Sequence, residues 1–172
     1  MIKLKFSLLI TIFLLSNLTY SQSIDYLDSI NGYKDLKFGM TKTELKDRIF
    51  DCSNQGHCLM MGNKYETIRN VKVKTTFTKF VENKLFAIYL IIEGQDNVDN
   101  LLDIYVETFG KASYSEKEKE GPIVYWEANN VLLSFDIDID NKGNVGATVI
   151  IVSKKLMDRN SQSEIKKNLD GL

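Results

Sequence analysis

The chain has 172 residues, and its 22 lysines and arginines nearly balance its 23 aspartates and glutamates, so the formal net charge is −1. This balance argues against a general nucleic-acid-binding protein, which needs a distinctly basic surface. The length and a hydrophobic content of 44% are sufficient for one domain with a core of modest size.

The N-terminal residues have the pattern of an export signal. Lys3 and Lys5 precede an apolar run over 8–15, and Thr19 and Ser21 are small enough for signal peptidase cleavage. The run is shorter than the roughly 20 apolar residues that span a bilayer, and no second run follows it. We therefore expect residues 1–21 to be a signal peptide that is cleaved near Ser21. The rest is expected to be exported, to the periplasm or out of the cell, without a transmembrane segment.

The first predicted elements are a short strand at 36–38 and a helix over 42–50. Thr41 occupies the N-cap position of this helix, and Glu44, three residues later, completes a capping box. Residues 71–81 alternate between polar and apolar side chains and are rich in β-branched residues, which predicts a strand.

The second half of the chain predicts a longer helix and more strands. Apolar residues recur at helical spacing from Val98 to Phe109, and Gly110 stands where a left-handed residue ends a helix. Alternating or continuous apolar runs predict the remaining strands, at 85–92, 123–127, 131–140 and 145–153.

The order of these elements predicts an α+β fold. Long crossovers of the βαβ kind are absent, so we expect an antiparallel sheet with two helices packed on one face. The order also suggests a tandem repeat of a helix followed by strands. We expect a single domain over 22–155 and a polar C-terminal tail over 156–172.

The segment Gly39-Met-Thr-Lys-Thr-Glu-Leu45 resembles the helix opening of small exported proteins with the beta-lactamase-inhibitor-like fold. That group includes the outer-membrane-assembly lipoproteins of the SmpA/OmlA family. The segment Tyr105–Lys111, followed by the strand that contains Trp126, looks like a second copy of the same plan. The resemblance implies a fold type and a function in binding. It carries over no partner and no functional residue, and the chain lacks the lipid-attachment cysteine of the lipoproteins.

Cys52 and Cys58 are the only cysteines, and in an oxidising compartment they are expected to form a local disulfide. Such a bond would pre-order the loop between them, so we take Asp51, Asn54, Gln55 and His57 as a candidate interaction loop. A zinc site made of Cys52, His57, Cys58 and Asp51 is an alternative. It is less favoured because the adjacent His57 and Cys58 side chains diverge.

Two charged groups are candidate ligand sites. Asp136, Asp138 and Asp140 alternate with apolar residues and are weak candidates for a calcium site, although no register fits the EF-hand loop. Lysines are in excess between residues 64 and 84, so that a basic face is expected there. Its candidate residues are Lys72, Lys74 and Lys79.

The motifs G-x-S-x-G and H-E-x-x-H, Gly-rich phosphate loops and paired Cys–His zinc spacings do not occur in the sequence, and a single histidine excludes a multi-histidine metal centre. We therefore expect a non-catalytic interaction module, without a cofactor, that binds an envelope or secreted protein. One alternative is a module for a small ligand or ion, such as calcium or an anionic ligand. Another is an enzyme of an unfamiliar type that uses a pair of carboxylates.

Overall fold

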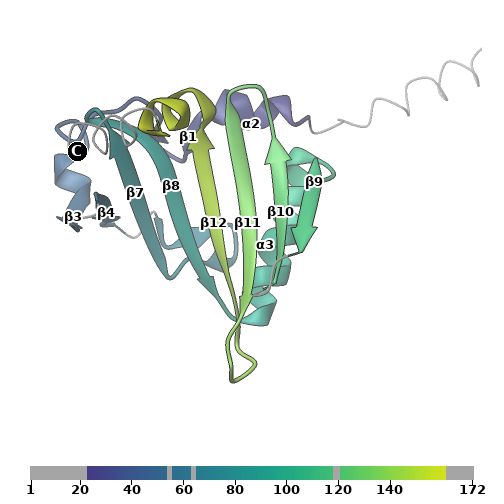
Figure 1. Ribbon diagram of the computed structural model, residues 1–172. Helices are drawn as coiled ribbons and strands as arrows, with labels where there is room; N and C mark the ends of the chain where they lie inside the picture. The colour runs from purple at the N-terminus through teal and green to yellow at the C-terminus, as the bar shows by residue number, and fades with distance from the viewer. Residues whose placement is uncertain (1–22, 54–55, 63–64, 118–120, 162–172) are drawn as a thin grey trace, which may run out of the picture.

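An eight-stranded sheet forms the centre of the molecule in this computed structural model, which describes residues 23–53, 56–62, 65–117 and 121–161. Every pair of neighbouring strands is antiparallel, and the order is β3-β4-β7-β8-β12-β11-β10-β9 (Figure 1). The strands are β3 (Ile49–Cys52), β4 (His57–Met60), β7 (Thr75–Val81), β8 (Lys84–Glu93), β9 (Tyr114–Lys117), β10 (Pro122–Glu127), β11 (Val131–Ile139) and β12 (Val145–Ser153). The predicted α+β class with an antiparallel sheet is confirmed.

The described residues also form helices and two small two-stranded sheets. The helices are α2 (Asp25–Ile30) and α3 (Gln95–Phe109). The small sheets pair β1 (Gly32–Tyr33) with β2 (Leu36–Lys37), and β5 (Thr67–Ile68) with β6 (Val71–Lys72). A further helical segment covers 154–161. Within the described ranges, no helix has the length and apolar character needed to cross a membrane.

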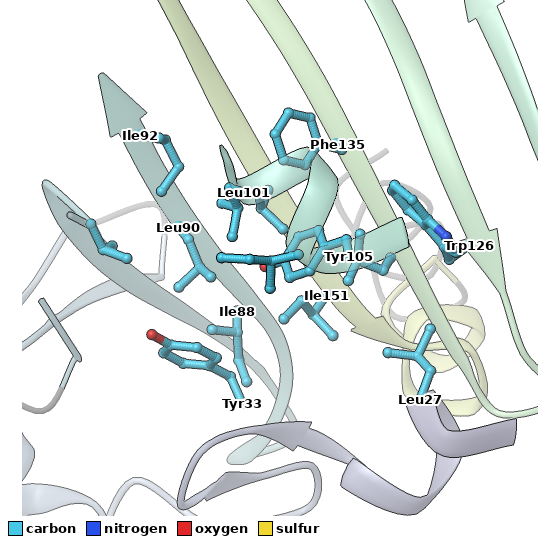
Figure 2. Close-up of a cluster of buried hydrophobic side chains, with 14 of the residues drawn as sticks. Leu27, Tyr33, Ile88, Leu90, Ile92, Leu101, Tyr105, Trp126, Phe135 and Ile151 are labelled. Carbon is cyan, nitrogen blue, oxygen red and sulfur yellow. The ribbon is translucent and has the colours of Figure 1, made fainter. Parts of the chain in front are cut away.

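The large sheet has one face in the core and one face largely uncovered by helices. On the core face, Ile88, Ile151, Leu133 and Trp126 are cross-strand neighbours, and all four are at least 96% buried. They belong to one core cluster with residues of α2 and α3, such as Leu27, Leu101 and Tyr105 (Figure 2). In Figure 1, α3 lies behind the sheet, so the view is onto the other face, which we call the open face.

Trp126 anchors the end of α3 to the sheet. Its indole Nε1 donates a hydrogen bond of 2.9 Å to the carbonyl oxygen of Gly110, the residue that ends the helix. Its ring also meets the ring of Tyr105 edge to face at 5.9 Å. The residue is fully buried, so this hydrogen bond satisfies the one polar atom of its side chain. The predicted helix and its C-terminal glycine are thereby confirmed.

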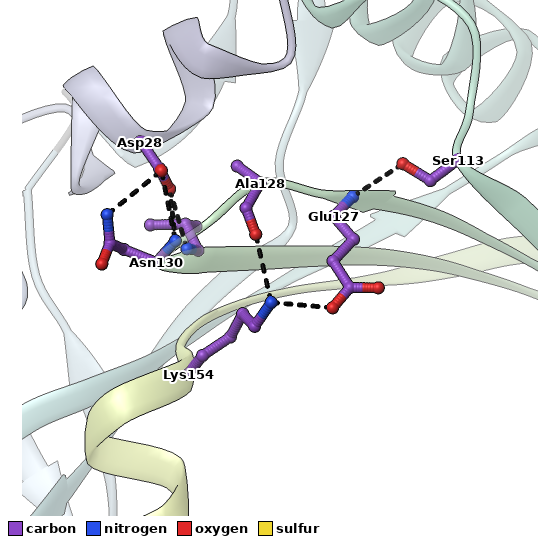
Figure 3. A network of polar contacts seen from close by, with 7 residues as sticks. Asp28, Ser113, Glu127, Ala128, Asn130 and Lys154 are labelled. Atoms are coloured by element: carbon purple, nitrogen blue, oxygen red, sulfur yellow. Dashed lines mark hydrogen bonds and ion pairs between the residues drawn. The ribbon is translucent and has the colours of Figure 1, made fainter.

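The short helix α2 is held against the turn between β10 and β11 by a carboxylate (Figure 3). Asp28 accepts hydrogen bonds from the backbone N–H groups of Asn130 and Val131, both at 2.9 Å, and from the Asn130 side chain. Beside the same turn, the Lys154 ammonium pairs with Glu127 at 2.7 Å. No helix was predicted from the sequence in this N-terminal segment.

The prediction of a helix over 42–50 is wrong. The capping box itself forms, because Thr41 N–H donates to the Glu44 carboxylate at 2.8 Å and Glu44 N–H donates to the Thr41 hydroxyl at 3.2 Å. Only a turn and the 3₁₀ helix Lys46–Arg48 follow it. The next residues pair with β4 as strand β3, and this pairing outweighs local helix propensity. The suggested tandem repeat therefore lacks its first helix.

The exposed edge strand β9 was not predicted from the sequence, and the predicted C-terminal tail differs from its prediction. The described start of the predicted polar tail is helical, and Leu156 packs there on Val81, Phe86 and Val152 at one end of the open face. Residues 1–21, the predicted signal peptide, lie outside the described residues.

Candidate functional site: the open face of the sheet

A continuous row of side chains crosses the open face from β4 to β9. Each member is the cross-strand partner of the next, so the row runs perpendicular to the strands. Its members, which we call the open-face row, are Leu59, Phe77, Tyr89, Ile150, Ser134, Tyr125 and Tyr114. All are half-buried except Tyr114, which is exposed. A row this rich in aromatic and aliphatic groups is a surface suited to contact with another molecule.

The middle of the row lies beside a hollow. A cavity of about 300 Å³ is lined by Tyr89, Ser134 and Ile150 of the row, and by Met157 and Asn160 of the helical segment 154–161. The helical segment thus forms a wall at one end of the open face. At the β9 end of the open-face row, the rings of Tyr114 and Tyr125 stack with their centres 4.5 Å apart. The surface therefore combines a recess with an exposed aromatic pair.

The predicted disulfide is present, and its cysteines lie on paired strands rather than in a loop. The Cys52 and Cys58 sulfurs are 2.11 Å apart, and the two residues are direct partners in the β3–β4 hairpin. Cys58 is fully buried, whereas Cys52 is exposed. The disulfide thus fastens the edge strand β3 to the rest of the sheet.

The residues of the predicted interaction loop are only partly brought to one surface. His57 lies on the open face in β4, and its ring centre is 5.5 Å from that of Tyr89. The Asp51 side chain is exposed on β3 and accepts a hydrogen bond from Cys52 N–H. Asn54 and Gln55 lie outside the described residues. His57 therefore lies beside the open-face row, in the neighbouring row with Lys79.

The three aspartates of the calcium candidate have different surroundings. Asp136 and Asp138 lie on β11, whereas Asp140 lies in the turn that follows. The Asp140 carboxylate accepts hydrogen bonds from the backbone N–H groups of Lys142 and Asn144 and from the Asn144 side chain. These bonds hold the pKa of Asp140 below its ordinary value. Asp140 thus orders its own turn.

Asp138 and Asp140 also line an open hollow of about 710 Å³ beside the start of α3, together with Glu93 and Asn144. Nowhere in the described ranges do three His, Cys, Asp or Glu side chains lie close enough to form a metal site. The arrangement therefore adds no support to the calcium hypothesis.

The lysines of the predicted basic face lie on three segments. Lys72 is exposed on β6, and Lys79 lies on β7 opposite His57. Lys74 precedes β7 and forms an ion pair with Glu93, which offsets its charge. Of the three, Lys79 is the one that lines the hollow of the open face.

Sequence reasoning missed the open-face row because its members come from seven strands whose order the sequence does not reveal. The signal that could have found part of it is the apolar character of both faces of β8. Tyr89 and Ile91 lie on the side of β8 that α3 does not cover, and Tyr89 packs there against a small cluster that includes Leu156.

Comparison of the chain with protein-family models, with curated proteins and with solved structures gives no match. The resemblance of the segment Gly39–Leu45 to the beta-lactamase-inhibitor-like fold therefore stays a prediction.

Proposed function

We propose that this protein is an exported, non-catalytic interaction module that binds an envelope or secreted protein through the open face of its sheet. The observation that carries the proposal is the open-face row, in which Phe77, Tyr89 and Tyr125 are only half-buried. Aromatic residues are enriched at protein–protein interfaces, where they lose their remaining contact with water.

Charged residues of both signs surround the open-face row, and this suits a protein partner better than a surface of uniform charge. Lys79 stands on one side of the row, while Asp136 and Glu116 belong to the neighbouring row on its other side. An apolar centre with polar groups of both signs around it is the usual anatomy of a specific protein interface. The predicted signal peptide and disulfide support the compartment in which the partner is sought.

Site-specific photo-crosslinking tests the proposal. A benzophenone amino acid is introduced in place of Tyr89, at the centre of the row, and the protein is illuminated in cells of the organism that makes it. We expect a reproducible adduct with one envelope or secreted protein, identified by mass spectrometry.

The matched control carries the same photoreactive residue at Asp103, which is exposed on α3 on the other side of the sheet. We expect no adduct there. A Phe77→Asp substitution added to the Tyr89 probe should remove the adduct, because a charge in the row opposes burial of its apolar neighbours. The proposal fails if the Tyr89 probe gives no adduct, or if both probes capture the same proteins.

A further inference from the structure

A second cavity lies on the side of the sheet that α3 covers, between α2, the β1 region, α3 and the core face. Its volume is about 270 Å³. Figure 2 shows Leu27, Tyr105 and Ile151 projecting toward the same space from α2, α3 and β12. Most of the wall is apolar, and its apolar residues include Leu27, Ile30, Ile104, Phe109, Leu133 and Ile151. The cavity therefore favours a ligand that is mainly apolar.

The charged residues of the wall already have partners. Among the described residues that line the cavity, two are charged, Lys34 and Arg69. The Arg69 guanidinium pairs with Glu107 at 2.7 Å. The Lys34 ammonium donates a hydrogen bond of 2.6 Å to the carbonyl oxygen of Thr67 and lies 5.3 Å from the centre of the Tyr33 ring. A charged ligand would lose its hydration here without gaining an available counter-charge, so the wall favours a neutral one.

Tyr33 brings to this wall a polar group that lacks a partner. Its side chain is 8% exposed, and its hydroxyl has no hydrogen-bond partner within the described part of the chain. Burial raises the pKa of this hydroxyl above its ordinary value, so that it stays a neutral donor. A buried donor without a partner costs stability. Because the hydroxyl is shielded from bulk water, the partner has to reach it from the cavity beside the ring.

We propose that this cavity binds a small, neutral and mainly apolar molecule that carries one hydrogen-bond-accepting oxygen, such as that of a ketone. The apolar part lies among Leu27, Ile104 and Ile151, and the oxygen accepts a hydrogen bond from the Tyr33 hydroxyl. A pocket with a mainly apolar wall and a few polar groups is the usual form of a small-molecule site. The assignment does not depend on the proposed function, because the cavity and the open-face row lie on opposite faces of the sheet.

The volume limits the size of the ligand. One molecule of liquid water occupies about 30 Å³, so the cavity holds on the order of ten non-hydrogen atoms. Acetophenone, isopropylbenzene and benzoate are of this size and have nearly the same shape. The first has a neutral acceptor oxygen, the second has no polar group, and the third carries a charge. The three compounds therefore separate the contributions of apolar contact, of the acceptor and of charge.

The first test is an NMR titration of the isotope-labelled protein, purified in the form in which the producing cell exports it. With acetophenone we expect saturable shifts at the amides of residues 26–34 and 104–109, and none along the open-face row. Isopropylbenzene should shift the same amides. Benzoate should bind about tenfold or more weakly than acetophenone, because its carboxylate would lose hydration in a wall whose cations are already paired.

Two tyrosine substitutions test the hydrogen bond. Tyr33→Phe should weaken acetophenone binding by about two- to tenfold, the range of a single hydrogen bond, and should leave the affinity for isopropylbenzene nearly unchanged. It should not lower the melting temperature of the free protein, since it removes a buried donor without a partner.

Tyr65→Phe is the matched control for the tyrosine pair. The Tyr65 ring centre lies 6.5 Å from that of Tyr33, but its hydroxyl donates a hydrogen bond of 3.0 Å to the Asp35 carboxylate, and Tyr65 does not line the cavity. We expect this substitution to lower the melting temperature, because it removes a hydrogen bond that exists, and to leave acetophenone binding unchanged.

Substitutions on α3 locate the site. Thr108→Phe places a ring at the cavity wall and should weaken the binding of acetophenone and isopropylbenzene by about tenfold or more, because it occupies the apolar space. Val106→Phe is the matched control on the same helix, since Val106 is 45% exposed and does not line the cavity. Near-ultraviolet circular dichroism of each variant separates lost binding from lost folding.

Four results would overturn the proposal. The first is the absence of saturable shifts with acetophenone, and the second is a set of shifts that maps to the open face. The third is an affinity for benzoate equal to that for acetophenone, which would contradict a neutral ligand. The fourth is a folded Tyr33→Phe variant that binds acetophenone as tightly as the unsubstituted protein, which would remove the hydrogen bond from the assignment.

Discussion

A single carboxylate joins parts of the chain that are 102 positions apart in the sequence. The hydrogen bonds that Asp28 accepts from three donor groups fix α2 to the β10–β11 turn, and the turn supplies backbone N–H groups that the sheet leaves unpaired. Charge-assisted hydrogen bonds of this kind are roughly twice as strong as neutral ones. Asp28 therefore positions α2 at one end of the sheet.

Replacing Asp28 with alanine should lower the free energy of unfolding by about 1–3 kcal/mol, because two backbone donors lose their partner. Urea denaturation followed by circular dichroism measures the change. Asp25→Ala in the same helix is the control and should change the stability by about 0.5 kcal/mol or less, since Asp25 is exposed. Equal losses in the two variants would show that the network of Figure 3 contributes nothing specific.

Asp140 gives the β11–β12 turn a dependence on pH. Its pKa is lowered first by the Asn144 side chain, and then by the Asn144 and Lys142 backbone N–H groups. A lowered pKa in the folded state means that the stabilisation is complete above the ordinary pKa of an aspartate. It is lost as the pH falls through the folded-state pKa.

We therefore expect the Asn144 amide signal in NMR spectra to stay constant at neutral pH and to move only in acid, below the usual range of aspartate titration. Asn144→Ala should raise the pKa of Asp140 toward its ordinary value, because the leading cause of the shift is removed. An Asp140 titration that is the same in both proteins would contradict this account.

At the scale of elements, the sequence predicts best those helices and strands whose characteristic residue pattern lies entirely within their own segment. The helix that became α3 carries its apolar stripe and its terminal glycine within a short segment, and both act as expected. The capping box at Thr41 and Glu44 also forms, but it specifies one turn only. Whether a helix continues past that turn depends on Ile49–Cys52 pairing with β4, and this is a tertiary contact that local patterns do not encode.

The disulfide acts on an edge strand that has little support from packing. Strand β3 is at the edge of the sheet and pairs on one side only, and most of its side chains are exposed. The double substitution Cys52→Ser/Cys58→Ser should lower the free energy of unfolding by about 2 kcal/mol on the chain-entropy model.

Hydrogen exchange measures how this loss is distributed along the chain. We expect faster exchange in β3 and β4, with little change in β8 and β12 at the centre of the sheet. Uniformly faster exchange over the whole sheet would contradict a local role for the disulfide.

At the scale of the whole molecule, the two faces of the sheet differ in how far their side chains are buried. The core face packs on α2 and α3 and contains the largest buried side chains, whereas the open face keeps aromatic groups half-buried at a recess. The strands themselves were visible in the sequence, some as alternating and some as continuous apolar runs. Which alternate set faces the helices, and which strands bring their outer residues into one row, depends on a strand order that only the folded structure supplies.

Adjacent residues of β12 allow the contributions of the two faces to be measured separately. Ile151 is 96% buried on the core face, whereas Ile150 is half-buried on the open face beside Tyr89. Ile151→Ala should cost about 2–4 kcal/mol of unfolding free energy, because it leaves a cavity in the core. Ile150→Ala should cost about 1 kcal/mol or less, since part of its surface is already in contact with water.

For partner binding, we expect Ile150→Ala to have the larger effect and Ile151→Ala the smaller one. Below the melting temperature of both variants, Ile150→Ala should weaken the adduct formed by the photoreactive residue at position 89, while Ile151→Ala should leave it intact. Chemical denaturation and the yield of adduct measure the two effects in the same preparations. If both quantities fall together in both variants, binding depends on the fold as a whole and not on the open face.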